Sequence, residues 1–377
     1  MRNKKRILLT RAAIAPYDVY LFNRLSEHFD INVLYFEPVE PYRKWEWVKE
    51  NARYKHFFAI TKQMKLFGKT LNISRLPDNL DLDEFDEIIL ETDTKNLLNN
   101  IILLKQAQKH NKTIGVNITI YKGYKIFYKG NIISSFLNFI INQFIKKYFF
   151  KNTEIKKYIG YGHEHCSLVE NNKPCFSPGY YYSLKEEYGV VSLDDVKSFN
   201  IKRFDKGKIK LLIISYLTPR KNVDFVIRLI NKFKDKFELH IVGDGDPKYV
   251  SYLKSLSTEN VFFHGIKFGK EKENFLKNSD FLIFHSLKDV WGLVLHEAMY
   301  FGLPFIASKN VPSARQILND CKCGFIYNNE NEFLKILNYI SKEMNKEKYI
   351  EISLKSKIFM DRFNEECYEN WKKFLEI

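Results

Sequence analysis

The 377-residue sequence has only five cysteines and ten prolines. So few cysteines, in an odd number, disfavour an oxidising compartment and predict a cytoplasmic protein. The basic N-terminus is followed only by the short apolar run Ile7–Thr10, which is too brief for the core of a signal peptide. A chain of this length predicts two or three domains.

Paired metal-ligand spacings are also missing. Cys321 and Cys323 are one residue apart, and His163, His165 and Cys166 lie in one short run. Neither group has the paired spacing of a zinc site, so we expect structural or incidental roles for them and no bound metal.

Acidic residues are absent between Thr94 and Thr153, a basic window that contains ten lysines. Within it, residues 131–150 form the most apolar stretch of the chain, interrupted by Asn and Lys. This stretch is compatible with an amphipathic helix on an anionic membrane, or with a core helix whose lysines face water. Contacts with nucleic acid are a third possibility, but no nucleic-acid module is recognisable and we expect no such partner.

Short apolar runs alternate with helical patterns in both halves, which predicts parallel βαβ units. The expected strands are 6–10, 31–36, 87–90, 113–116, 158–160, 209–214, 239–242, 261–263, 281–284, 305–307 and 324–327. The expected helices are 19–29, 97–109, 223–233 and a tail from about 332. The pattern predicts an α/β fold with Rossmann-like domains at 1–185 and 208–355, joined by a polar linker at 186–207. Residues 356–377 are expected to form a helix that crosses back to the first domain.

The most informative stretch runs from Asp289 to Ser308. Two carboxylates, Asp289 and Glu297, lie eight positions apart, and Gly292 marks the change from loop to helix. Backbone N–H groups at a helix N-terminus hold a diphosphate, and a carboxylate in the first turns accepts hydrogen bonds from ribose. This spacing suits a sugar nucleotide bound at the carboxyl ends of parallel strands.

The stretch reads DVWGLVLHEAMYFGLPFI and resembles the signature of the family 4 (group 1) glycosyltransferases, which are retaining enzymes of the GT-B fold. ISYLTPRKNVD at 214–224, IVGDG at 241–245, VFFHG at 261–265 and GFIY at 324–327 are similar to other motifs of this family. The resemblance covers about 208–327. It implies transfer of a sugar from a UDP- or GDP-sugar to an acceptor hydroxyl, with retention of configuration and without a metal.

The resemblance also implies roles for individual residues. Glu297 would bind the ribose and Asp289 the donor sugar, while Lys221 would neutralise the departing diphosphate. Asp289 is shorter than the family's usual Glu, and Tyr216 occupies the position of a usual Arg, for which Arg220 is a possible substitute. The expected catalytic residues are Lys221, Asp289 and Glu297, and the expected donor-binding residues are Ser215, Arg220, Lys221, Gly243, Gly292, Leu293, Val294 and Glu297.

The sequence indicates the acceptor-binding residues less clearly than the donor-binding residues. Some family members have a histidine at the strand end where this chain has Asn117. Asp18, Glu91 and Asp93 are carboxylates at expected element ends, and we take Asp18, Asp93 and Asn117 as candidate acceptor contacts. The basic window favours a lipid-linked or anionic glycan acceptor, as in surface-polysaccharide, lipopolysaccharide or glycolipid assembly at the inner face of a membrane. A GT-B epimerase or hydrolase, or a non-catalytic polyanion- or membrane-binding protein, remain as alternatives.

Overall fold

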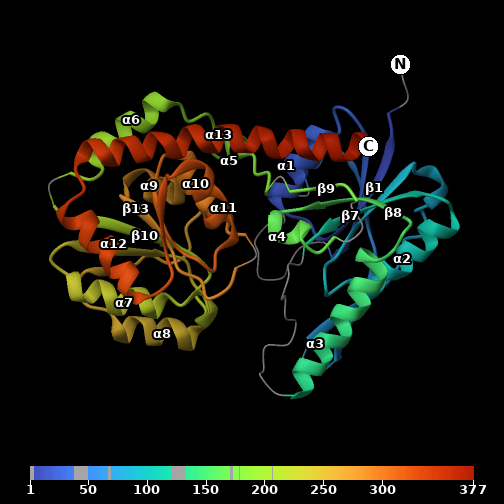
Figure 1. Ribbon diagram of the computed structural model, residues 1–377, viewed down its shortest axis with the longest axis horizontal. Coiled ribbons are helices and arrows are strands. Elements are labelled where there is room, and N and C mark those ends of the chain that lie inside the picture. The colour runs from blue at the N-terminus through green and yellow to red at the C-terminus, as the bar shows by residue number, and fades with distance from the viewer. Residues whose placement is uncertain are drawn as a thin grey trace. The chain divides into compact units, whose positions relative to one another are not determined.

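The computed structural model describes residues 4–37, 50–66, 69–119, 132–169, 173–177, 179–205, 207–289 and 291–377 (Figure 1). The chain forms two compact units: Met1–Tyr182 with Glu366–Ile377, and Ser183–Glu365. Each unit contains a parallel sheet with helices, so the predicted fold class is confirmed.

The first unit contains a seven-stranded parallel sheet in the order β3-β2-β1-β6-β7-β8-β9. Its strands are β1 (Arg6–Ala13), β2 (Asp30–Glu37), β3 (Lys55–Phe58), β6 (Glu87–Glu91), β7 (Thr113–Ile118), β8 (Ile155–Gly160) and β9 (Cys175–Phe176). A separate antiparallel pair is formed by β4 (Ile60–Leu66) and β5 (Lys69–Arg75). The helices are α1 (Pro16–Leu25), α2 (Leu97–Lys109), α3 (Ile132–Ile145) and α4 (His163–Cys166). The order of strand addition reverses between β1 and β6, which is where such sheets bind ligands.

The second unit repeats this arrangement with six parallel strands in the order β12-β11-β10-β13-β14-β15. They are β10 (Ile209–Ile214), β11 (Phe237–Val242), β12 (Val261–Phe263), β13 (Phe281–Phe284), β14 (Phe305–Ser308) and β15 (Gly324–Tyr327). Its helices are α5 (Leu184–Tyr188), α6 (Leu193–Lys202), α7 (Val223–Ile230), α8 (Pro247–Leu256), α9 (Gly269–Asn278), α10 (Leu293–Tyr300), α11 (Pro312–Cys321), α12 (Glu330–Lys342) and the first part of α13 (Lys346–Glu376). Here the order reverses between β10 and β13.

The segment predicted as a linker, 186–207, is instead largely helical and belongs to the second unit. Ser192 and Asp195 form a reciprocal capping box at the start of α6. Arg203 is buried and donates hydrogen bonds to the carbonyl oxygens of Phe301 and Gly302. The segment has a polar composition because α6 buries few side chains, and this composition led to the linker prediction. The start of α6 is specified by its cap and not by an apolar pattern.

The C-terminal part of α13 packs within the first unit. Lys157 on β8 is fully buried, forms an ion pair with Glu87 on β6 (Nζ–Oε1 2.8 Å) and donates to the carbonyl oxygen of Phe374. Lys5 donates to the carbonyl oxygen of Leu375 (2.9 Å). These contacts join the end of the chain to the middle of the first sheet, as the predicted crossing-back helix requires.

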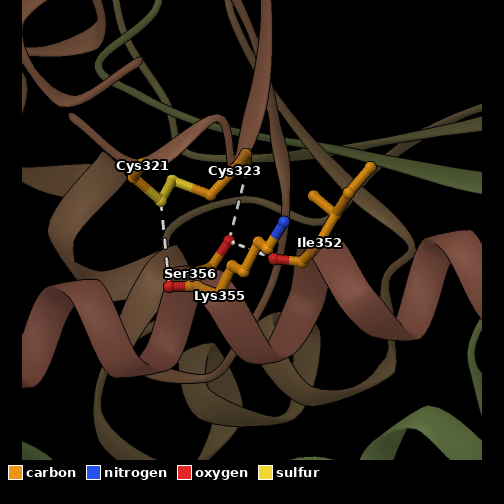
Figure 2. The surroundings of a disulfide bond; sticks show 5 residues. All are labelled: Cys321, Cys323, Ile352, Lys355 and Ser356. Atoms are coloured by element: carbon orange, nitrogen blue, oxygen red, sulfur yellow. Dashed lines mark hydrogen bonds between the residues drawn. A yellow bond between two sulfur atoms is a disulfide. The ribbon is translucent and has the colours of Figure 1, made fainter. Parts of the chain in front are cut away.

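Four of the five cysteines are paired, Cys166 with Cys175 and Cys321 with Cys323. Figure 2 shows the second pair against α13, where the Ser356 hydroxyl donates to the carbonyl oxygen of Cys323 (3.2 Å). Within the described residues, no group of three or more His, Cys, Asp and Glu side chains is placed to hold a metal ion. The same residues include no helix that combines the length and the apolar character needed to cross a membrane.

Candidate active site

The candidate site lies at the carboxyl edge of the second sheet, at the reversal point between β10 and β13. The loop after β10 leads through Ser215 to Lys221, and the loop after β13 leads to Asp289. The backbone N–H of Leu287 donates to the carbonyl oxygen of Arg220 (3.0 Å), which joins the two loops. Strands that are neighbours in the sheet therefore bring together residues almost 70 positions apart.

Arg220, Lys221 and Asp289, all predicted for this site, form one ionic cluster. The Lys221 Nζ lies 2.5 Å from Asp289 Oδ2, and Arg220 Nη1 lies 3.5 Å from the same oxygen. The side chains of Lys221 and Asp289 are only 14% and 13% exposed, so solvent screens this ion pair weakly. Tyr216 is 59% exposed, and Arg220 is the second cation that lies near Asp289.

Ser215 and Gly243 directly follow the neighbouring strands β10 and β11, and close chain packing accounts for the glycine. A Cβ on Gly243 would lie 1.9 Å from the carbonyl oxygen of Ser215, and its φ is +139°. The fold therefore requires a glycine here whether or not a ligand binds. The Ser215 hydroxyl is buried and has no hydrogen-bond partner among the described residues, which leaves it able to bond to a ligand.

The helix predicted after the loop is α10, which begins directly after Gly292. The N–H groups of the first turn, including those of Leu293 and Val294, have no acceptor within the helix. Together with the helix dipole they form a site suited to an anion, which begins four residues beyond Asp289. Gly292 has a φ of +108°, and a Cβ on it would lie 2.2 Å from Cε1 of Phe284.

Replacing Gly292 with alanine is expected to destabilise the protein by about 2 kcal/mol or more, because the new methyl group combines left-handed backbone strain with a clash. Gly265→Ala is the matched control, since Gly265 has a φ of +67° but nothing within 4 Å of the place that a Cβ would occupy. Urea unfolding should show a clearly larger loss for Gly292→Ala, and equal losses would contradict the importance of the Phe284 contact.

Glu297 lies on α10 and is 5% exposed. Both of its carboxylate oxygens contact Lys272 Nζ from α9, at 2.7 and 2.6 Å. The sequence did not point to Lys272, because it stands in a charged run with Lys270 and no spacing distinguishes the two. A ribose that bonds to Glu297 must share the carboxylate with this ammonium group or displace it.

The candidate acceptor residues lie at the carboxyl edge of the first sheet. Asp18 on α1 is buried and paired with Arg11 on β1 (Oδ1–Nε 3.1 Å). Burial raises the pKa of Asp18, and Arg11 opposes the shift. Asn117, at the end of β7, is also buried, and its Oδ1 has no hydrogen-bond partner among the residues described.

Asp93 has a local structural role near the start of α2. Its carboxylate accepts the N–H of Lys95 (3.3 Å) and both the backbone and side-chain N–H of Asn96 (3.1 and 2.6 Å). These bonds occupy the carboxylate as a turn and helix-start acceptor. Burial also raises its pKa.

Comparison with known sequences gives partial matches. Residues 194–354 match the sequence profile of the family described as "Glycosyl transferases group 1". An uncharacterized 41.2 kDa protein in the cps region of Klebsiella pneumoniae is 30% identical over 156 residues, which cover 39% of this chain and 42% of that protein. The O-antigen biosynthesis glycosyltransferase WclY of Escherichia coli is 28% identical over 151 residues, 39% of this chain and 40% of its own. The chain thus matches less than half the length of either relative.

Solved structures match over nearly the whole chain. The structure of Anabaena Alr3699/HepE in complex with UDP and glucose has a TM-score of 0.67 and 13% identity, and the match covers 97% of this chain and 99% of that one. Sucrose-phosphate synthase from Thermosynechococcus elongatus has a TM-score of 0.68 and 11% identity, with 99% and 98% covered. At these identities the likeness concerns the fold, which is GT-B.

Proposed function

We propose that this chain, which has the GT-B fold and carries a group 1 glycosyltransferase domain in residues 194–354, transfers a sugar from a nucleoside diphosphate sugar to an acceptor hydroxyl with retention of configuration. The observation that carries the proposal is the cluster of Arg220, Lys221 and Asp289 just before the N-terminus of α10. Two cations and a helix end at the reversal point of a parallel sheet suit a bound diphosphate.

The chemical step follows from the charge of the leaving group. As the bond from the anomeric carbon to the phosphate oxygen breaks, negative charge builds on the diphosphate, where Lys221, Arg220 and the first amides of α10 stabilise it. The acceptor oxygen bonds to the same face of that carbon, and its proton passes to a phosphate oxygen of the leaving group. Side-chain cations supply the positive charge, so the proposal needs no metal.

The relatives support a role in surface-polysaccharide assembly with a glycan or lipid-linked acceptor held by the first unit, since one is named for O-antigen biosynthesis. We include in the proposal a peripheral position on the cytoplasmic face of the membrane. It is supported by α3, on which Phe139 and Phe144 are 59% and 49% exposed close to Lys146 and Lys147. Apolar side chains beside lysines favour an anionic lipid surface. Three further lysines of the basic window, at 122, 125 and 129, lie outside the described residues.

A thermal-shift screen with UDP-, GDP- and ADP-sugars tests the donor site. At a ligand concentration of about 100 Kd, binding should stabilise the folded protein by about 2.7 kcal/mol. Glu297→Gln should lose this stabilisation, because an amide accepts ribose hydrogen bonds more weakly than a carboxylate does. Glu271→Gln, an exposed position on α9, is the matched control. Stabilisation by none of the nucleotide sugars, or full stabilisation of Glu297→Gln, would contradict the assignment.

Product analysis in the same preparation separates the remaining alternatives. An epimerase or hydrolase releases an epimer or free sugar when only the donor is supplied, whereas a transferase requires an acceptor for efficient turnover. A non-catalytic polyanion-binding protein shows salt-sensitive binding to vesicles that contain phosphatidylglycerol and no affinity for nucleotide sugars. Vesicle binding together with nucleotide-sugar affinity is the combination that the proposal expects.

A further inference from the structure

A small polar cavity of about 60 Å³ lies at the carboxyl edge of the first sheet. Its lining includes Arg11 from β1, Asp18 from α1, Glu91 from β6, and Tyr161 and Tyr180. β1 pairs with β6 in parallel with Ile7 opposite Glu87, and the same register continued brings Arg11 level with Glu91. The cavity therefore occupies the reversal point of the first sheet, as the donor site does in the second.

An ion pair between Arg11 and Asp18 forms part of the cavity lining. The Arg11 guanidinium donates to Asp18 Oδ1 (3.1 Å) and to the carbonyl oxygen of Thr10 (3.0 Å), and it lies over the ring of Phe22. Arg11 and Asp18 are both buried. Because the guanidinium is already paired and bonded, it forms a neutral polar wall with Asp18 and is poorly placed to attract an anion.

The contacts within the fold give no structural reason for a buried carboxyl group at Glu91. Its side chain is buried, Oε2 accepts the N–H of Ala12 (2.9 Å), and no cation of the described residues comes within ion-pair distance of the carboxyl group. Burial, together with Asp93 and Asp18 and against the effect of Arg11, raises the pKa of Glu91 to about 8. At neutral pH the group is mostly a carboxylic acid, which donates a hydrogen bond as well as accepting one.

Part of the lining is aromatic. The rings of Tyr161 and Tyr180 stack with centroids 3.7 Å apart, and Tyr17 meets Tyr180 edge-on at 5.3 Å. Outside the lining, Asn117 Nδ2 lies 3.5 Å from the hydroxyl of Tyr161, and the buried Oδ1 of Asn117 has no partner among the described residues. Aromatic faces with a few convergent polar groups are typical of pockets for small uncharged ligands.

We propose that this cavity is a subsite for a hydroxyl-bearing edge of a neutral sugar, with Glu91 as a hydrogen-bond donor to that sugar. The proposal rests on the function proposed above, under which the sugar is part of the acceptor. A cavity of about 60 Å³ has room for a hydroxymethyl or hydroxyl group, since one water occupies about 30 Å³ of liquid. A phosphate or carboxylate would find no free cation among the described residues of this lining, because the Arg11 guanidinium is already bonded to Asp18, and this favours a neutral ligand.

Saturation-transfer NMR with methyl glycosides of glucose, galactose and N-acetylglucosamine, in the presence of UDP, tests the subsite across pH 6.5 to 9.5. With a pKa of about 8, the protonated fraction of Glu91 falls about tenfold between pH 7 and pH 9, and the affinity of wild type for the bound glycoside should fall with it. Glu91→Gln keeps a neutral donor and should bind at every pH. Glu91→Ala should lose binding, and Glu154→Gln, at an exposed position on the same unit, should follow wild type.

Each contrary outcome has a defined meaning. The subsite is overturned if wild type binds none of the three glycosides, if Glu91→Ala binds as wild type does, or if Glu91→Gln keeps the wild-type pH dependence. Thermal shifts with nucleotide sugars in the same samples report the donor site independently. Glycoside binding without any nucleotide-sugar shift would support the subsite and reject the proposed donor, whereas the reverse pattern would reject the subsite alone.

Discussion

Replacing Lys221 with alanine is expected to lower kcat for sugar transfer about 100- to 1000-fold, the loss typical when one preorganised donor to a developing negative charge is removed. The Lys221 ammonium is largely buried at the reversal point of the second sheet and lies 2.5 Å from Asp289. Charge on the departing diphosphate grows as the glycosidic bond breaks, so the contact strengthens in the transition state. The KM for the donor should change much less than kcat.

Steady-state transfer assays measure this effect, and Lys232→Ala is the matched control because Lys232 is an exposed lysine of the same unit, paired with Glu330. Loss of Lys221 also leaves Asp289 with fewer partners, and a disturbed site would lower activity by a different route. The double variant Lys221→Ala/Asp289→Asn separates the two effects. If neutralising Asp289 restores activity, or if Lys221→Ala alone stays within about threefold of wild type, Lys221 does not act on the leaving group.

Much of the fold could be predicted from the sequence because its strands are short, continuous apolar runs. Ile209–Ile214 and Phe281–Phe284 coincide with β10 and β13, and the helix at Leu97–Lys109 is α2. Such runs are typical of parallel strands covered on both faces. The β4–β5 pair was not predicted because its strands, with polar residues such as Lys62 and Gln63 next to each other, do not alternate clearly between apolar and polar side chains. The helix expected at 19–29 is α1 in the structure. It begins at Pro16, because proline is favoured in the first turn of a helix.

The clustering of Arg220, Lys221 and Asp289 could be predicted because these residues lie within two motifs of the sequence. Arg220 and Lys221 follow β10, and Asp289 and Gly292 follow β13, so strand adjacency alone brings them to one edge. Lys272 could not be found in this way, because it is one lysine of a charged run on α9 and no spacing distinguishes it. For the cavity of the first unit, the sequence indicated Asp18 and Glu91 at expected element ends but not Arg11, Tyr161 and Tyr180, because no motif connects these residues.

The two sheets have the same strand order around their reversal points, but the charges of the side chains there differ. In the second unit, Arg220 and Lys221 outnumber the single carboxylate of Asp289, which suits a diphosphate. In the first unit, Arg11 is paired with Asp18, and Glu91 adds a further carboxyl group. The same backbone frame thus supports an anion site in one unit and a neutral polar site in the other.

Glu91→Gln is expected to stabilise the protein at pH 9 by about 3 kcal/mol relative to wild type and to leave its stability nearly unchanged at pH 4. The pKa of Glu91 is about 8 in the folded protein, against an ordinary value of 4.5 for a glutamate in an unfolded chain. The folded state therefore binds more protons than the unfolded state between these values, and the free energy of unfolding of wild type falls as pH rises through that window. The difference between the two pKa values sets an upper limit of about 5 kcal/mol, at about 1.36 kcal/mol per pKa unit.

Glutamine cannot ionise, so the variant escapes this loss while it keeps an oxygen to accept the N–H of Ala12. Other titrating groups act on both proteins alike, and the difference between wild type and variant isolates Glu91. A gain of about 3 kcal/mol corresponds to a rise in Tm of about 6 to 12 °C for a unit of this size, measurable by thermal melting at pH 4 and pH 9. Glu154→Gln should show no such pH-dependent gain. A Glu91→Gln protein that melts at or below the wild-type temperature at pH 9 would show that Glu91 is stabilised as a carboxylate, and the neutral donor assigned to the sugar subsite would then be wrong.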